Sequence, residues 1–461
     1  MSVTTLRRRF GFAAVVLGLV IAIAPAASAG PAVPGDQEWA SRYNGPASST
    51  DKPAAMVVSP DGSRVFVTGY SEGVDTGADF TTVAYERSTG AQLWVARYDG
   101  QGSPYDTDVP SGIAVAPDGG TVFVTGRSDG PTGTNYVTIA YDATTGDQQW
   151  LARAPFGSGL PSGVAVSPDG STVFVTGTGG INFFLYDITI AYDATTGTQE
   201  WQSTYTNLST LGSTGLAVSP DGAHVFVVGS EGGGGGSEVT VLSYDAANGD
   251  QEWVGTYSTT SSNIPNAFAL SPDGSRLFVA GYTGPLGTGH GLDALSVAFD
   301  TSTGAQLWSS VFNGRSGRDD YANAVTVNPA GTKVYVAGAA DQRESLGKLL
   351  TISYDASTGE TLRLASYDVE GRDVATGIAM SPLGATVFVT GWSPGIDTAL
   401  DFVTLAYTAR NLRQLWVSRY DDPGHHEDQA VAVAVTPSTS RPSPIAPDRS
   451  PTRQAEVTLP P

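Results

Sequence analysis

The chain has 461 residues, a formal net charge of −21 at pH 7 and no cysteine. Without cysteine, disulfides, thiolate metal ligands, cysteine nucleophiles and lipid-modified cysteines are all excluded. A surface this acidic repels phosphate backbones and anionic lipids, so we expect neither nucleic acid nor a membrane surface as a partner.

The N-terminus has the pattern of an export signal. Residues 7–9 are three arginines, residues 10–24 form a nearly unbroken apolar run, and residues 27–29 (Ala-Ser-Ala) offer a small-residue cleavage site. We expect residues 1–29 to be removed by the general secretory or the twin-arginine route, which leaves a secreted chain with a charge of −24. The apolar run is short for a spanning helix, and no second one follows, so no membrane span is expected.

One sequence unit recurs along the rest of the chain, and residues 112–150 are a clear copy of it. A Ser-Pro pair or its equivalent falls at 59/60, 116/117, 167/168, 219/220, 271/272, 328/329, 381/382 and 436/437. The spacing of 51 to 57 residues, repeated in this way, predicts a repeat architecture.

Each unit contains four short segments that alternate apolar and polar residues in the manner of β-strands. In the second unit these are residues 112–116, 121–125, 136–141 and 148–153, separated by turn sequences rich in Pro, Asp and Gly. Four-stranded units of this length, joined end to end, are typical of β-propeller blades. The rungs of a β-solenoid are much shorter than this period, which excludes that fold.

Counting the units predicts an all-β propeller of seven four-stranded antiparallel blades. Full units begin near residues 55, 112, 163, 215, 267, 324 and 377. Residues 37–43 (QEWASRY) match an isolated fourth strand, and residues 430–435 match an isolated first strand. The alternative is therefore an eight-bladed ring with an incomplete eighth blade. We expect a single propeller domain over 30–437 and a Pro-rich, disordered tail over 438–461.

The passage from the third to the fourth strand carries a motif of the form A-x-D-x-x-T-G-x-x-x-W, as in Ala140, Asp142, Thr145, Gly146 and Trp150. It resembles the tryptophan-docking motif of quinoprotein-like propellers. Segments 39–46 (WASRYNGP), 65–70 (VFVTGY) and 318–327 (RDDYANAVTV) also resemble bacterial extracellular propeller repeats of the SBBP and YVTN types. The resemblance implies a propeller architecture and does not specify an activity.

Seven tryptophans occupy the last position of this motif. We interpret them as large side chains wedged between neighbouring blades; the alternative is a set of aromatic platforms for a sugar or a quinone. They are Trp39, Trp94, Trp150, Trp201, Trp253, Trp308 and Trp416.

The two faces of such a propeller differ in sequence. Turns between the first and second strands and between the third and fourth strands share one face and are nearly uniform, as SPDG and DATTG or close variants. Loops between the second and third strands, with the connections between blades, share the opposite face and differ in every unit. Divergent loops on a rigid frame favour recognition, although drift without constraint is the alternative.

Five aspartates recur at one place on the variable face, four residues before the Gly or Ala of each first strand. We predict that they ring the mouth of the central channel and bind Ca²⁺ or another hard cation through carboxylate oxygens. The alternative is that each caps its own inter-blade turn. They are Asp51, Asp108, Asp320, Asp373 and Asp428.

Evidence for catalysis in the sequence is poor. The four histidines lack zinc-site spacing, and no nucleophile elbow is present. The one metal-like cluster, His425-His426-Glu427-Asp428, lies in a loop after the last full unit, where a solvated turn is the alternative. We therefore predict a secreted, monomeric, non-catalytic propeller without cofactor that binds a protein, a glycan or a cell-wall component. The alternatives are a hydrolase or lyase with paired carboxylates such as Asp319-Asp320, a quinone-dependent dehydrogenase, and a spacer within a surface layer.

Overall fold

The computed structural model describes residues 35–100, 107–130, 133–156, 159–181, 184–206, 210–233, 236–285, 291–314, 317–343, 346–369, 371–395, 399–421, 428–436 and 456–458. These residues form strands and turns and contain no helix, so none of them forms a helix long and apolar enough to cross a membrane. The expected export signal, residues 1–29, lies outside the described residues.

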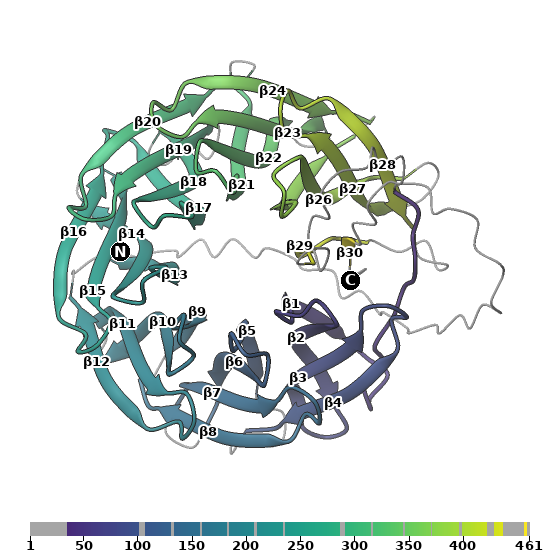
Figure 1. The fold of residues 1–461 in the computed structure, drawn as a ribbon, viewed down its shortest axis with the longest axis vertical. Helices are drawn as coiled ribbons and strands as arrows, with labels where there is room; N and C mark the ends of the chain where they lie inside the picture. The colour runs from purple at the N-terminus through teal and green to yellow at the C-terminus, as the bar shows by residue number, and fades with distance from the viewer. Residues whose placement is uncertain are drawn as a thin grey trace, which may run out of the picture.

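Seven four-stranded antiparallel sheets surround a central axis, which confirms the predicted β-propeller (Figure 1). Blades 1 to 7 are, in chain order, β1 (Asp51–Val58), β2 (Arg64–Gly73), β3 (Gly77–Glu86), β4 (Gln92–Tyr98); β5 (Asp108–Val115), β6 (Thr121–Ser128), β7 (Asn135–Asp142), β8 (Gln148–Ala154); β9 (Leu160–Val166), β10 (Thr172–Ile181), β11 (Phe184–Asp193), β12 (Gln199–Tyr205); β13 (Thr210–Val218), β14 (His224–Gly233), β15 (Gly236–Asp245), β16 (Gln251–Tyr257); β17 (Ser262–Leu270), β18 (Arg276–Gly284), β19 (Asp293–Asp300), β20 (Gln306–Phe312); β21 (Asp319–Val327), β22 (Lys333–Arg343), β23 (Leu346–Asp355), β24 (Thr361–Tyr367); and β25 (Val374–Met380), β26 (Thr386–Pro394), β27 (Leu400–Thr408), β28 (Gln414–Tyr420).

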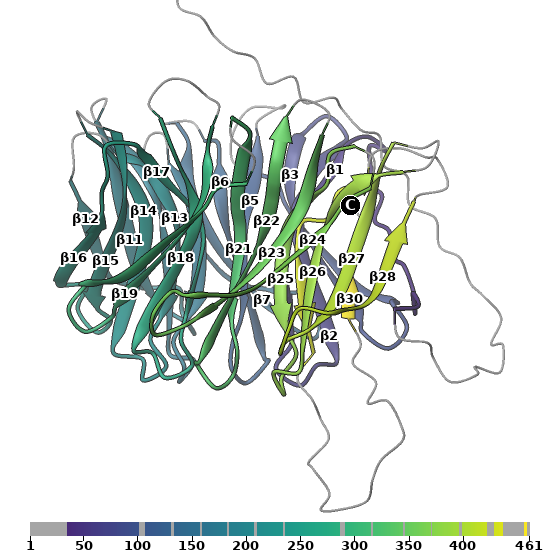
Figure 2. The same ribbon diagram turned by 90° about the horizontal axis from the view of Figure 1, so that it is seen from above.

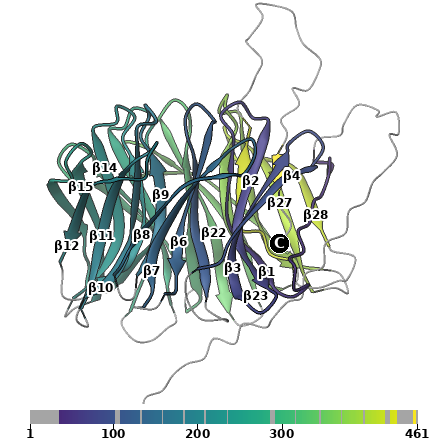
Figure 3. The same cartoon turned by 90° about the horizontal axis from the view of Figure 1, so that it is seen from below.

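Each blade is a meander whose first strand lies nearest the axis and whose fourth strand forms the rim. From β1 through β5, β9, β13, β17 and β21 to β25, each inner strand contacts the next one around the ring. Seen from the side, the strands run between two faces that carry the turns and loops (Figures 2 and 3). Every loop therefore belongs to one of two opposite faces of a rigid disc.

The core lies between the blades, and strand alternation explains why both sides of each sheet are apolar. In β6, Phe123 packs into the cluster shared with blade 3, whereas its neighbours Val122 and Val124 pack into the cluster shared with blade 1. Successive side chains of a strand point to opposite faces of its sheet. An internal blade thus needs hydrophobic residues at consecutive positions, because a neighbouring sheet covers each of its faces.

The ring closes between blades 7 and 1 through segments from both ends of the chain. The short strand β29 (Val433–Val435) contacts both β25 and β1, so it takes the place of an inner strand. On the outside, the indole N–H of Trp39 donates to Arg87 O at 2.7 Å, and Gly35 lies against the indole of Trp416. The guanidinium Nε of Arg42 also donates to the hydroxyl of Tyr420 at 3.1 Å.

The ring therefore has seven complete blades, and the two terminal segments lie where the alternative prediction placed an incomplete eighth blade (Figure 1). Residues 37–43, predicted as an isolated fourth strand, lie along the rim without forming a hydrogen-bonded strand. The predicted first strand 430–435 is shorter, since β29 begins only at residue 433. Residues 456–458 of the expected disordered tail instead form β30 (Glu456–Thr458), which pairs antiparallel with β29.

Candidate functional site

The uniform face is held together by its own hydrogen bonds. In every blade the residue at the start of the turn between the third and fourth strands donates its N–H to the turn between the first and second, as Arg87 N does to Ser63 O at 3.0 Å. Within the latter turn, Asp61 accepts bonds from the Ser59 hydroxyl and from the Ser63 backbone and hydroxyl, which lower its pKa to about 2. Asp169 and Asp273 repeat this arrangement, also with a pKa of about 2. These carboxylates stabilise the turns in which they lie by accepting hydrogen bonds within them.

The motif tryptophans contact the neighbouring blade in the same way around the ring. The indole N–H of Trp150 donates to Ala194 O at 2.9 Å, and its ring lies over Gly197. A glycine is required under the indole: Gly146 has φ of +78°, and an added Cβ would come within 2.7 Å of the Trp94 ring. The other indole bonds run from Trp39 to Arg87 O, Trp94 to Ala143 O, Trp201 to Ala246 O, Trp253 to Thr301 O and Trp308 to Ala356 O, while Trp416 lies against Gly35.

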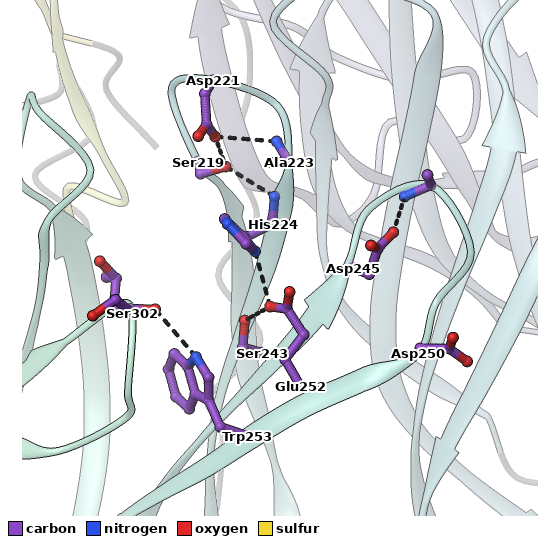
Figure 4. A network of polar contacts seen from close by, with 12 residues as sticks. Ser219, Asp221, Ala223, His224, Ser243, Asp245, Asp250, Glu252, Trp253 and Ser302 are labelled. Carbon is purple, nitrogen blue, oxygen red and sulfur yellow. Dashed lines mark hydrogen bonds and ion pairs between the residues drawn. The ribbon is translucent and has the colours of Figure 1, made fainter.

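The one His–carboxylate–Ser group in the described residues lies next to the uniform face (Figure 4). His224 Nδ1 lies 2.8 Å from Glu252 Oε2, and the Ser243 hydroxyl donates to the same oxygen at 2.7 Å. Both side chains thus bond to the carboxylate rather than to each other. A nucleophile and its general base must share a hydrogen bond, so this group lacks the geometry of a catalytic triad.

The variable face brings the loops between the second and third strands beside the connections between blades. The backbone N–H of Asp320 donates to Leu292 O at 2.7 Å, and that of Asp428 donates to Leu400 O at 2.6 Å. Residues 131–132, 182–183, 234–235, 286–290, 344–345, 396–398 and 422–427 are outside the described part of the chain. The last range contains His425, His426 and Glu427.

Four of the five aspartates of the predicted cation ring accept a hydrogen bond from the inter-blade turn that precedes them. The donors are Gly45 N to Asp51, Gly100 N to Asp108, Gly314 N to Asp320 and Val369 N to Asp373, at 2.6 to 3.0 Å. Asp108, Asp320, Asp373 and Asp428 are buried, whereas Asp51 is half-buried. Burial raises the pKa of Asp108, Asp320 and Asp373. These bonds are the ones that turn capping requires, and the shared ring around one cation stays a prediction.

Asp319 and Asp320, the carboxylate pair considered for acid–base catalysis, bond to different segments. Asp319 Oδ1 accepts from Gly291 N at 2.6 Å and from Leu292 N at 3.1 Å. Asp320 Oδ1 accepts instead from Asp341 N at 2.8 Å, and its other oxygen accepts from Gly314 N. The two neighbouring carboxylates therefore each hold backbone in place.

Three acidic side chains gather at the junction of blades 1 and 2. Within the described part of the chain, Asp79, Asp99 and Asp108 form the one group of three whose carboxylate oxygens lie within 4.8 Å of one another. A parallel bridge between Ala78 and Thr107 sets Asp79 beside Asp108, and Asp99 directly follows β4. Of the three, only Asp108 belongs to the recurring pattern in the sequence, because Asp79 and Asp99 meet it only through strand pairing.

A second buried acidic pair lies between blades 3 and 4. Asp187 and Glu231 are 6% and 4% exposed, respectively. Burial, followed by the charge of Glu231, raises the pKa of Asp187 to about 6. Strand register shows that Asp187 occupies the place of Phe80 in blade 1 and Leu349 in blade 6, which a comparison of the seven repeats would have revealed.

Seven blades with indoles docked between them define a quinoprotein-like β-propeller. The family model described as outer membrane protein assembly factor BamB (PQQ_2) matches residues 20–155 and 133–401, and the chain belongs to this family. A search of the curated proteins found no match.

Solved structures show similarity to other propellers. Sqt1 of Chaetomium thermophilum, bound to the N-terminus of the ribosomal protein L10, has a TM-score of 0.57 at 14% identity, over 84% of this chain and 92% of Sqt1. The periplasmic gluconolactonase PpgL of Pseudomonas aeruginosa has a TM-score of 0.48 at 18% identity, over 71% and 88% of the two chains. At these identities the similarity to Sqt1 concerns the fold.

Proposed function

We propose that this chain is an exported, non-catalytic β-propeller that binds a protein partner through its variable face. The observation that carries the proposal is the contrast between the two faces. Repeated turns with bonded carboxylates form one face, whereas the other presents different side chains from blade to blade. Among these are large apolar residues that no neighbouring strand covers: Val74, Leu160 and Leu346 are 63%, 52% and 50% exposed.

Exposed apolar side chains within an acidic, polar surface are the usual anchors of a protein interface. Sqt1 holds the N-terminus of a ribosomal protein in its crystal structure, so a propeller of similar architecture can serve as a peptide-binding scaffold. A glycan or a cell-wall component is the alternative ligand for the same face. The charge and apolar pattern of residues 1–29 supports export of the chain.

The arrangement of acidic groups also supports binding over catalysis. Asp187 and Glu231 would be the natural acid–base pair, but both are buried between blades, where a substrate has no access. The more exposed group of His224, Ser243 and Glu252 lacks a hydroxyl–imidazole bond. Neither group pairs an activated nucleophile with an accessible surface, which a hydrolase would require.

The test compares how surface variants of the two faces bind to an isolated cell-envelope fraction from the source organism. The variable-face variant carries Val74→Ser, Leu160→Ser and Leu346→Ser together. Its matched control is Leu383→Ser, because Leu383 is 77% exposed in a turn of the uniform face. We expect binding to fall at least tenfold in the first and to change less than twofold in the control.

Treating the envelope fraction with protease or with a muramidase identifies the ligand class. Loss of binding after protease treatment supports a protein partner, whereas loss after muramidase treatment alone replaces it with a cell-wall glycan. Equal binding by wild type and the triple variant would overturn the assignment of the variable face.

A further inference from the structure

The junction of blades 1 and 2 concentrates negative charge in a buried place. Asp79 and Asp108 are 4% and 1% exposed, and Asp99 lies beside them at the surface. The guanidinium of Arg97 pairs with Asp79 at 2.8 Å. Within the described part of the chain, Asp108 forms no ion pair of its own, and its carboxylate lies beside those of Asp79 and Asp99.

The two buried carboxylates each have one engaged oxygen and one without a partner. Asp79 Oδ2 accepts from Arg97 and from the Thr76 hydroxyl, and Asp108 Oδ2 accepts from Gly100 N at 2.6 Å. Asp79 Oδ1 and Asp108 Oδ1 are buried and have no hydrogen-bond partner in the described structure. A buried carboxylate oxygen without a donor is costly and calls for an ion or a water molecule that supplies the missing interaction.

The corresponding place in blade 6 holds a positive charge of the chain itself. Strand register aligns Lys348 with Asp79 and Asp368 with Asp99, since Leu349 pairs with Tyr367 as Phe80 pairs with Tyr98. There the ammonium of Lys348 lies 3.3 Å from Asp368 Oδ2. In blade 1 a carboxylate replaces the lysine, so the position that supplies positive charge in blade 6 supplies negative charge here.

We propose that Asp79, Asp99 and Asp108 bind one Ca²⁺ ion that joins blade 1 to blade 2. Ca²⁺ takes hard oxygen ligands at about 2.3–2.6 Å, so ligands on opposite sides of one ion lie up to about 5 Å apart. The carboxylate oxygens here lie within 4.8 Å of one another. The site differs from the predicted ring of five aspartates, because it draws its three ligands from one junction. It is also independent of the proposed binding to a partner.

The experiment is calcium titration of the chelator-treated, purified chain by isothermal calorimetry, with melting temperature as a second readout. Wild type should bind one Ca²⁺ with a Kd of about 10⁻⁴–10⁻³ M, the range of extracellular modules, and should melt at a higher temperature when loaded. Asp108→Asn and Asp99→Asn should each weaken binding at least tenfold. Asp99 is exposed, so its variant tests the site even if Asp108→Asn fails to fold.

Blade 7 offers a matched control. Asp401, Asp421 and Asp428 occupy the same places there, with Arg419 paired to Asp401 at 2.9 Å, yet their carboxylates do not form such a group. Asp428→Asn should therefore leave calcium affinity unchanged. The proposal is overturned if wild type gives no binding at about 10 mM Ca²⁺, well above the expected Kd. It is also overturned if Asp99→Asn binds like wild type, or if Asp428→Asn weakens binding as much as Asp108→Asn, since that would favour the ring.

Discussion

Asp187 is a carboxylic acid at a place that other blades fill with a hydrophobic side chain, and its replacement should stabilise the protein. Burial and the nearby charge of Glu231 raise its pKa from 3.8 to about 6. Each pKa unit corresponds to about 1.4 kcal/mol, so the charged form costs about 3 kcal/mol in the folded state. Asp187→Asn removes that charge and retains an acceptor for the Thr178 hydroxyl, which lies 3.5 Å away.

The stability advantage of Asp187→Asn over wild type should increase with pH. The folded pKa lies above the unfolded value, so the folded state holds the proton more tightly and the wild type loses stability as the pH rises from about 4 to about 6. Above that window the penalty is complete, and below it the penalty disappears. The free energy of unfolding of Asp187→Asn should therefore exceed that of wild type by up to about 3 kcal/mol at pH 7.5 and match it at pH 4. A chain of this size would gain about 4 °C in Tm.

Urea unfolding followed by tryptophan fluorescence at pH 7.5 and at pH 4 measures this difference. Asp142→Asn is the control of opposite sign, since backbone N–H groups of Thr145 and Thr144 lower the pKa of that carboxyl and favour its charged form. It should destabilise the protein at pH 7.5. The reasoning is wrong if Asp187→Asn has no advantage at pH 7.5, or if its advantage is the same at pH 4.

Substitutions at Gly146 and Trp150 test the docking of indoles between blades by chemical unfolding, with Gly291→Ala as a control. Gly146→Ala should destabilise the protein by at least about 1 kcal/mol more than Gly291→Ala, because both have similar positive φ but only the former places a Cβ against an indole, that of Trp94; equal losses would contradict this. Trp150→Ala should cost about 3–5 kcal/mol. Trp150→Phe should cost less, since it keeps most of the apolar contact and loses the bond to Ala194 O; a loss below about 1 kcal/mol for the alanine variant would contradict the docking role.

The blades were predictable because their turns repeat a chemistry that ends strands at fixed places. The beginnings of the inner strands were not. We predicted a strand from residue 112, whereas β5 begins at Asp108. The register of β5 against β6 shifts between Pro110 and Gly112, and this irregularity interrupts the alternation on which the prediction depends.

The candidate sites likewise include residues that the sequence predicted and residues that it did not. Asp108 stood out because its place recurs in other repeats, whereas Asp79 and Asp99 lie 20 residues apart and meet through the pairing of β3 with β4. A sequence pattern common to residues 79–99 and 401–421, with Asp-Phe at the start and Arg-Tyr-Asp at the end, would have pointed to them. The raised pKa of Asp187 had no signal within its own repeat. It depends first on burial between blades and then on the charge of Glu231 in the next repeat.

The contact between Arg42 and Tyr420 joins residues 378 positions apart, so it can form only late during synthesis of the chain. A polypeptide that emerges from its N-terminus exposes the rim segment long before its partner on β28 exists. The first blades therefore form an open arc, and the ring closes only after nearly the whole chain has been synthesised. A stalled or shortened product would keep two bare sheet faces available for unwanted association.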